Sequence, residues 1–292
     1  MRTHDHTIAT EDGRKIRIID AGQPDGIPIL VLHGTPSAGV LYAPWVKDAE
    51  SRGIRLISYF RPGYGGSTSQ PGRHIASTAN DVAVIAQELG LSRICVWGLS
   101  MGGSHALACA ALLPNLVVAA ASLASPAPYQ ADGLDFFAGM MEDNIAEFGT
   151  ALKGRDEIEQ FVETAAQGML NATPENVTEG FRSILSPVDV AVLTDDFVGF
   201  LLEGIREGNR EKRDGWIDDD LAFVLDWVFD LAQIRIPLML MHGKQDKIVP
   251  FSHGKWLTDR ISNVDAFLLP DDGHLTLSHR IPVVHTWLLG KM

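Results

Sequence analysis

The stretch Ile94-Cys-Val-Trp-Gly-Leu-Ser-Met-Gly-Gly, residues 94–103, joins a short apolar run to a segment rich in small residues. The apolar run has the length and composition of a buried strand, and the segment from Met101 onward has a helical pattern. Ser100 stands at the join, with Gly98 two residues before it and Gly102 two residues after it. Glycines at these places leave room for a sharp turn that exposes the serine hydroxyl, and the start of a helix offers free N–H groups beside it. The stretch therefore predicts a strand, a tight turn with an accessible serine, and a helix.

Short apolar runs of the same kind recur along the chain and alternate with helical patterns. Continuous apolar runs are expected for strands of a parallel sheet, because helices cover both of its faces. An opening hairpin is predicted around Asp12-Gly13, a favourable turn pair. The alternation predicts an α/β fold with a doubly wound, mostly parallel sheet. The expected strands are residues 29–33, 55–59, 94–97, 116–123, 238–242 and 265–269, and the expected helices are residues 76–89, 101–113, 254–261 and 282–289.

The strand–helix alternation is interrupted between Pro126 and Ile236. Residues 127–230 have a mostly helical pattern and contain 23 Asp and Glu against 7 Lys and Arg, so they carry the acidic excess of the chain. We predict that residues 1–126 and 231–292 form the sheet domain and that residues 127–230 form a helical cap inserted in it. The excess of acidic residues indicates either a solvated helical surface or a negative electrostatic field that favours cationic or amine-bearing substrates. The run Asp218-Asp219-Asp220 is interpreted as a solvated turn of the cap and not as a cation site, because three consecutive side chains diverge on any regular element.

Composition narrows the class of protein. The 292 residues have a formal net charge of −13, which argues against nucleic acid and anionic membrane surfaces as partners. No apolar run is long enough to span a membrane and residues 1–12 lack the apolar core of a secretory signal, so we expect a cytoplasmic monomer or homodimer with a small-molecule substrate.

Cys95 and Cys109 are expected to be buried thiols. The sequence lacks metal-ligand spacings and a dinucleotide-binding glycine motif, so no metal and no cofactor are expected.

A loop after an early strand is expected to complete an anion-binding site beside Ser100. The segment His33-Gly34-Thr35-Pro36 stands at the end of the expected strand 29–33. We expect the backbone N–H groups of Thr35 and Met101 to form an oxyanion hole, which is usually the largest electrostatic contribution to acyl transfer. His33 is expected to support this loop and not to transfer protons.

Two further catalytic candidates follow the last two expected strands. Asp246 lies after residues 238–242, at the carboxyl edge of the sheet, where doubly wound folds build their sites. His274 lies after residues 265–269 and directly follows Gly273, which would let the loop turn toward Ser100. The other nine histidines do not combine this position with a flanking glycine. The sequence therefore predicts Ser100 as nucleophile, His274 as general base and Asp246 as the acid that orients it.

The order Ser, Asp, His along the chain is that of the α/β hydrolases. The sequence resembles this superfamily over nearly its whole length, through HGTP (33–36), RPGYGGS (61–67), GLSMGG (98–103), HGKQDKIVP (242–250) and DDGH (271–274). The resemblance implies the α/β-hydrolase fold and a serine hydrolase activity. Many members have an aspartate before the arginine of the second motif, where this chain has Phe60. The hydrogen bonding of that turn is therefore left open.

The leading functional hypothesis is a carboxylic-ester hydrolase that acts on a small or medium acyl group through an acyl-enzyme. One alternative is an aminopeptidase similar to the proline-iminopeptidase branch, although this chain has HGTPS and GLSMGG where that branch has HGGPG and GGSWGG. A non-catalytic ligand-binding protein on a hydrolase scaffold is another, and a cofactor-free haloperoxidase-like side activity stays open. Apolar side chains of the cap either line the substrate pocket or pack the cap onto the sheet domain. The candidates are Phe136, Phe137, Met140 and Trp216, together with Phe197 and Trp227.

Overall fold

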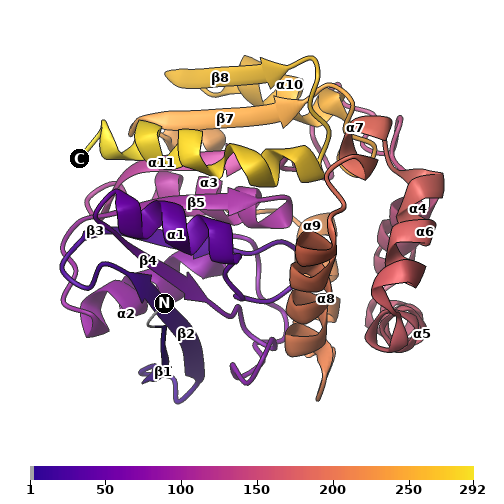
Figure 1. Cartoon of the computed structure of the whole chain (residues 1–292), viewed down its shortest axis with the longest axis horizontal. Coiled ribbons are helices and arrows are strands. Elements are labelled where there is room, and N and C mark those ends of the chain that lie inside the picture. The colour runs from indigo at the N-terminus through magenta and orange to yellow at the C-terminus, as the bar shows by residue number, and fades with distance from the viewer. Residues whose placement is uncertain (1–2) are drawn as a thin grey trace.

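The computed structural model describes residues 3–292 and has an eight-stranded sheet at its centre (Figure 1). The strand order is β1-β2-β4-β3-β5-β6-β7-β8. Strand β2 pairs antiparallel with both β1 and β4, and all later pairings are parallel, so the carboxyl ends of β3 to β8 lie at one edge. The strands are β1 His4–Ala9, β2 Lys15–Gly22, β3 Ile27–Leu32, β4 Ile54–Tyr59, β5 Ile94–Leu99, β6 Val117–Leu123, β7 Leu238–Gly243 and β8 Val264–Leu269.

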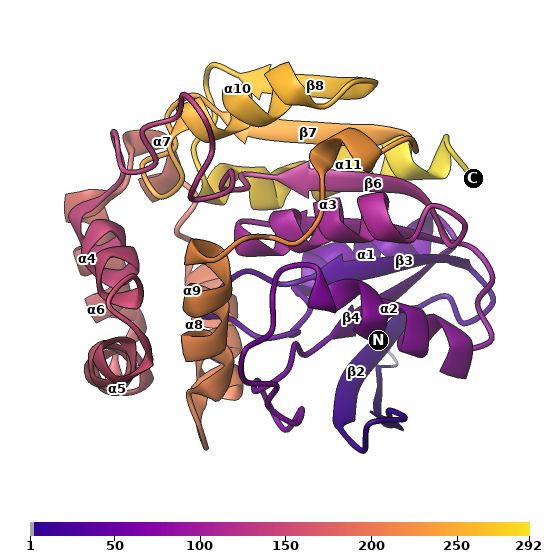
Figure 2. The same ribbon diagram turned by 180° about the vertical axis from the view of Figure 1, so that it is seen from behind.

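Helices cover both faces of the sheet (Figures 1 and 2). Helices α1 and α11 lie on one face, and α2, α3 and α10 lie on the other. Strand β7 is therefore buried along its whole length, and β5 is buried up to its last residue. This double burial accounts for the continuous apolar runs of the central strands. The helices are α1 Ala43–Ser51, α2 Ser77–Glu88, α3 Met101–Leu112, α10 Phe251–Arg260 and α11 Ile281–Leu289.

The predicted fold class is confirmed, with small differences in the elements. Strand β3 ends at Leu32, so His33 already belongs to the loop after it. The opening hairpin turns around Asp12-Gly13 as expected, and Gly13 has a positive φ of 83°. Helix α1 has no counterpart among the predicted helices. It is nine residues long and buries only three side chains, which is too short a periodic pattern to stand out in the sequence.

Helix α3 packs unusually close to the strands beneath it. Eleven of its twelve residues are buried, and Met101 at its start is followed by Gly102, Gly103 and Ser104, all of them small. A Cβ atom added to Gly102 would overlap the carbonyl oxygen of Leu32, and one added to Gly103 would overlap the hydroxyl of Ser125. The start of the helix can therefore occupy this position only because both residues are glycines.

Between β6 and β7 the chain forms a series of helices and no strand. These helices stand beyond the carboxyl ends of the parallel strands (Figure 1). We refer to these helices as the cap segment, and the predicted domain division at residues 127 and 230 stays a prediction. Its helices are α4 Glu142–Ala151, α5 Arg155–Asn171, α6 Pro174–Ile184, α7 Pro187–Val190, α8 Asp195–Asn209 and α9 Asp214–Val224.

Two further expectations concern the cysteines and the membrane. Cys95 and Cys109 are both free and both buried, as predicted. Within residues 3–292, none of the helices combines the length and the apolar character that crossing a membrane requires.

Because α3 packs so closely on the strands, a single methyl group added at Gly102 should destabilise the fold strongly. We expect Gly102→Ala to lower the free energy of unfolding by about 3 kcal/mol, because the added Cβ must displace the backbone of β3. Gly180→Ala is the matched control, since a Cβ there meets nothing within 4 Å in exposed helix α6 and should raise stability by up to about 1 kcal/mol. Urea unfolding followed by circular dichroism measures both. Equal stability of the Gly102→Ala and wild-type proteins would contradict this packing.

Candidate active site

Ser100 occupies a strained turn between β5 and α3. Its backbone has φ 58° and ψ −132°, a region that residues with a side chain rarely adopt. A Cβ added to Gly98 would overlap the carbonyl oxygen of Gly102, so the two glycines make the tight turn possible. Ser100 itself is only half-buried. The turn therefore presents a reachable hydroxyl at the carboxyl edge of the sheet, which is the geometry of a nucleophile elbow.

His274 and Asp246 form a buried hydrogen-bonded pair at the same edge. The Nδ1 atom of His274 lies 2.8 Å from Oδ2 of Asp246. The other oxygen of Asp246 accepts the backbone N–H groups of Ile248 at 2.9 Å and Val249 at 2.8 Å, which fixes the carboxylate. Because a carboxylate can only accept, Nδ1 carries the hydrogen and Nε2 is left as a proton acceptor.

The charge of Asp246 also tunes the imidazole. Burial alone would lower the pKa of His274, but the charge and the hydrogen bond of Asp246 raise that pKa above its usual value. Among residues 3–292, no hydrogen bond joins the Ser100 hydroxyl to the His274 ring. Such bonds are often long in a free enzyme and tighten when substrate binds.

The loops that carry Asp246 and His274 are bound to each other. The backbone N–H of Gln245 donates to the carbonyl oxygen of Asp272 at 2.9 Å, and that of Lys244 donates to Leu269 at 2.8 Å. A Cβ added to Gly243 would overlap the carbonyl oxygen of Asp272. The two loops therefore form one rim, although they lie about one strand and one helix apart in sequence.

The HGTP loop lies against the serine from the opposite side. A Cβ added to Gly34 would lie 3.2 Å from Cβ and 3.9 Å from Oγ of Ser100. The Nε2 atom of His33 accepts the backbone N–H of Arg61 at 3.1 Å, so Nδ1–H donates to the carbonyl oxygen of Gly34 at 3.1 Å. Burial and the nearby Arg61 charge lower the pKa of His33 well below its usual value, which keeps this ring neutral. His33 thus braces the loop that carries Thr35.

Known proteins resemble this chain over almost all of its length. Residues 27–279 match the model of a family described as alpha/beta hydrolase fold. The chain belongs to the α/β hydrolase fold family. It is 26% identical over 275 residues to the AB hydrolase superfamily protein YisY of Bacillus subtilis, with 92% of each chain covered. It is 25% identical over 270 residues to the bifunctional esterase/perhydrolase DCH of Acinetobacter calcoaceticus, covering 91% of this chain and 92% of that protein.

A solved structure has the same fold as this chain. The esterase EaEST from Exiguobacterium antarcticum superposes with a TM-score of 0.70 at 22% identity, and the match covers 98% of this chain and 99% of that one. Its family membership and its hydrolase and esterase relatives identify this α/β hydrolase as an enzyme of the hydrolase type.

Phe60 replaces the acid of the RPGYGGS turn without leaving the turn unsupported. The Ser67 hydroxyl donates to the carbonyl oxygen of Phe60 at 2.7 Å and accepts the backbone N–H of Arg17 at 3.0 Å. The Phe60 ring is buried, and the guanidinium carbon of Arg17 lies 4.4 Å from its centroid. A cation–π contact and a serine bridge therefore hold a turn that carries an aspartate in many α/β hydrolases.

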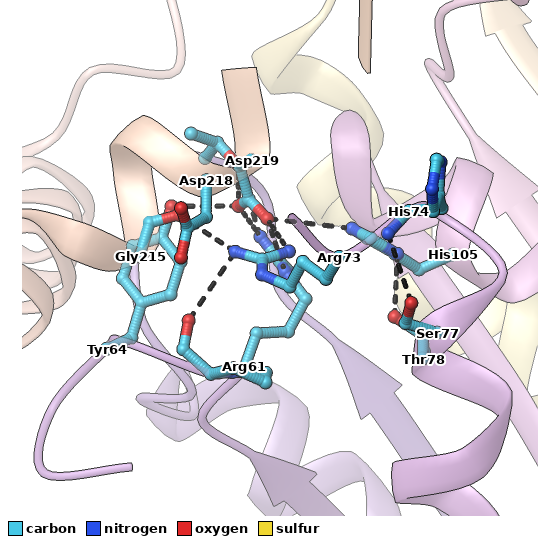
Figure 3. A network of polar contacts seen from close by, with 12 residues as sticks. Arg61, Tyr64, Arg73, His74, Ser77, Thr78, His105, Gly215, Asp218 and Asp219 are labelled. Atoms are coloured by element: carbon cyan, nitrogen blue, oxygen red, sulfur yellow. Dashed lines mark hydrogen bonds and ion pairs between the residues drawn. The ribbon is translucent and has the colours of Figure 1, made fainter. Parts of the chain in front are cut away.

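A buried ion cluster joins cap helix α9 to the loops of the sheet domain (Figure 3). Asp219 is completely buried and accepts from Arg61 at 2.6 Å and from Arg73 at 2.5 Å. The Tyr64 hydroxyl donates to the same carboxylate at 2.8 Å, and the Thr35 hydroxyl donates to it as well. Burial alone would raise the pKa of Asp219, but the two guanidinium charges hold it well below its usual value. Asp219 thus stays ionised and binds the HGTP loop from the cap side.

The prediction of a solvated turn at Asp218-Asp219-Asp220 was wrong. All three lie in helix α9 and are at most 2% exposed, because α9 is enclosed between the sheet domain and the other cap helices. Asp218 is paired with Arg155 of α5, which is 63 residues away in sequence, and Arg61 is 158 residues from Asp219. Partners at such separations leave no local pattern, so neither the burial nor the ion pairs of Asp219, Arg61 and Arg73 could be found from the sequence.

The predicted pocket-wall residues make contacts within the protein. Phe136, Met140 and Trp216 are buried, and Phe137 is half-buried. The Phe136 ring packs edge-on against His253, with 4.9 Å between ring centroids, and the Trp216 indole N–H donates to Glu147 at 2.5 Å. Phe197 and Trp227 are buried too. These contacts favour the packing interpretation for Phe136 and Trp216, and their contact with substrate stays a prediction.

Within the described residues 3–292, His, Cys, Asp and Glu side chains form no group of three or more that could hold a metal ion.

The Asp219 cluster predicts a strong dependence of stability on one carboxylate. We expect Asp219→Ala to lower the free energy of unfolding by about 3–5 kcal/mol, because Arg61 and Arg73 would be left as buried, uncompensated charges. Glu159→Ala is the control: it removes an exposed acid of cap helix α5 and should change stability by less than about 0.5 kcal/mol. Chemical denaturation measures both values, and similar losses in the two variants would argue against the cluster.

Proposed function

We propose that this α/β hydrolase is a serine hydrolase that cleaves a small-molecule carboxylic ester through an acyl-enzyme. The observation that supports this most strongly is the strained, reachable Ser100 at the sheet edge that also carries the buried His274–Asp246 pair. The relative DCH of Acinetobacter calcoaceticus is a bifunctional esterase/perhydrolase, which is in keeping with this proposal.

In the proposed reaction His274 moves one proton at each step. Its Nε2 atom takes the proton of the Ser100 hydroxyl as Oγ bonds to the carbonyl carbon of the ester. Asp246 stabilises the imidazolium that forms, and the N–H groups of Thr35 and Met101 stabilise the negative carbonyl oxygen. The carbon–oxygen bond to the alcohol then breaks, and His274 gives its proton to the leaving alcohol. Water attacks the acyl-enzyme in the same manner, which releases the acid and restores Ser100.

The charge state of the cap bears on the aminopeptidase alternative. That hypothesis requires free carboxylates in the cap to bind an amino group. Asp219 and Asp218 are paired with arginines, and burial together with the neighbouring Glu147 raises the pKa of Asp220 well above its usual value. None of these three acids offers a free, charged carboxylate to an amino group, which counts against them as the amine-binding groups of an aminopeptidase. Parallel assays with an aryl ester and an aminoacyl-arylamide should show faster ester hydrolysis, and the opposite preference would support the aminopeptidase.

The nucleophile is tested directly by mutation. We expect Ser100→Ala to lower kcat/KM for p-nitrophenyl acetate by about 10⁴-fold or more, because no other group in the proposed mechanism forms the acyl-enzyme. A fluorophosphonate probe should label the wild-type protein at Ser100 and leave the variant unlabelled. Ser51→Ala, which changes an exposed serine of α1, is the control and should keep full activity. Pure Ser100→Ala protein that still turns over the ester would refute the mechanism.

The proposed role of His274 as general base predicts how kcat/KM depends on pH. His274 must be neutral to accept the serine proton, so kcat/KM should rise with pH. The midpoint should lie above the ordinary histidine pKa of about 6.5, because the Asp246 charge outweighs the lowering by burial. Asp246→Asn should move the midpoint to lower pH and reduce the plateau by about 10⁴-fold. A pH profile of ester hydrolysis measures this, and a wild-type midpoint below the ordinary value would count against the pair.

A further inference from the structure

A second buried carboxylate contacts the loop of His274, and it comes from the cap. Asp189 lies in the short helix α7 and is completely buried. Its Oδ2 atom accepts the backbone N–H of His274 at 2.9 Å and the hydroxyl of Ser186 at 2.9 Å. Its Oδ1 atom accepts the backbone N–H groups of Leu275 at 2.7 Å and Thr276 at 3.1 Å. Three consecutive backbone N–H groups, beginning with that of His274, therefore converge on one side chain.

These donors have no partners of their own in the local backbone. Residues 275–280 form a short 3-10 helix with His274 at its N-cap, and the first N–H groups of a helix lack acceptors within it. A local Ser, Thr, Asp or Asn usually supplies such an acceptor. Here Asp189 supplies it from 85 residues earlier in the chain. The conformation at His274 thus depends on the cap segment.

The residue before the histidine is adapted to this contact. A Cβ added to Gly273 would overlap the carboxylate of Asp189. Gly273 has no positive φ, so its value lies in the space it leaves and not in an unusual backbone conformation. The sequence-based reason for Gly273, that it lets the loop turn, therefore gives way to a steric one.

Resting on the proposed function, we propose that Asp189 is a positioning residue that holds His274 in line with Asp246 and Ser100, so that the cap takes part in assembling the catalytic site. The hydrogen bonds from the backbone N–H groups of residues 274–276 to Asp189 fix the backbone position from which the imidazole side chain extends. A misplacement of about 1 Å can cost on the order of 10²-fold in rate. The cap would then take part in catalysis by fixing the position of His274.

The charge of Asp189 has a separate consequence. The titratable groups facing His274 are Asp246 from the loop after β7, Asp189 from α7 and His242 from β7. Burial lowers the pKa of His242, which therefore stays neutral. Burial also acts to lower the pKa of His274, while Asp246 and then Asp189 act to raise it. Removing the Asp189 charge should therefore make His274 less basic, an effect that a purely structural cap of the helix would not produce.

The contact can be broken without removing other supports of the rim. The Asp246 and His274 loops keep their mutual backbone hydrogen bonds, and the N–H of Gly273 donates to the Thr276 hydroxyl at 2.8 Å. Asp189→Asn keeps the size of the side chain and one acceptor oxygen. Its NH₂ group would face either the N–H of His274 or those of Leu275 and Thr276, and a donor facing a donor forms no bond.

The experiment measures ester hydrolysis by Asp189→Asn against pH. We expect kcat to fall by about 10²-fold while KM changes by less than about threefold, because the reacting groups and not the substrate contacts are displaced. The midpoint of kcat/KM should move to lower pH. Asp195→Asn removes one charge from the exposed start of cap helix α8 and should leave both quantities unchanged. A folded Asp189→Asn protein with wild-type kcat and midpoint would overturn the proposal.

Hydrogen exchange of the wild-type protein decides the matter if the variant does not fold. The amides of His274, Leu275 and Thr276 should exchange slowly, because each donates to a buried carboxylate. Exchange at the rate of exposed loop amides would overturn the proposal. The failure of the proposed function looks different: wild-type protein would then neither hydrolyse the ester nor react with the fluorophosphonate, whatever the exchange rates.

Discussion

The close approach of helix α3 to strands β3 and β5 is the constraint around which the rest of the structure is arranged. It holds Ser100 in a positive-φ conformation that residues with a side chain rarely adopt, which costs on the order of 1–3 kcal/mol, and the burial of nearly all of α3 offsets that cost. Glycines at 98 and 102 are the condition for this approach, since neither position has room for a side chain. The result is a hydroxyl fixed at the carboxyl edge of the sheet, with the HGTP loop on one side of it.

Around that fixed point, buried carboxylates of the cap hold the loops of the sheet domain. Asp219 contacts the HGTP loop through Thr35 and Arg61, and Asp189 contacts the loop of His274. Buried ion pairs are weak evidence for net stability, because desolvation offsets much of the attraction. Their geometric demands are strict, however, and each carboxylate here accepts from three or more donors. We interpret them as fixing the orientation of the cap relative to the two loops.

The strands, the main helices and the serine turn could be predicted because each rests on neighbouring residues. The apolar run 94–97 can be recognised without knowing its neighbours in space. The glycines at 98 and 102 likewise indicate a tight turn by themselves. The pairing of Asp246 with His274 was expected from their places after two adjacent strands, and the two side chains are hydrogen-bonded. Helix α1 was missed because three buried residues make too short a pattern. The aspartates at 218–220 were misplaced because the arginine partners of Asp218 and Asp219 lie far away in sequence.

The sequence by itself determined the alternation of strands and helices, the turn that exposes Ser100 and the order of the candidate triad, because periodicity and turn chemistry act over a few residues. Tertiary structure decided which acids of the cap are buried, which arginines neutralise them, and that Asp189 holds the backbone at His274. Those pairings depend on the packing of segments that are 60 or more residues apart, and a carboxylate looks the same in a sequence whether it faces water or a guanidinium.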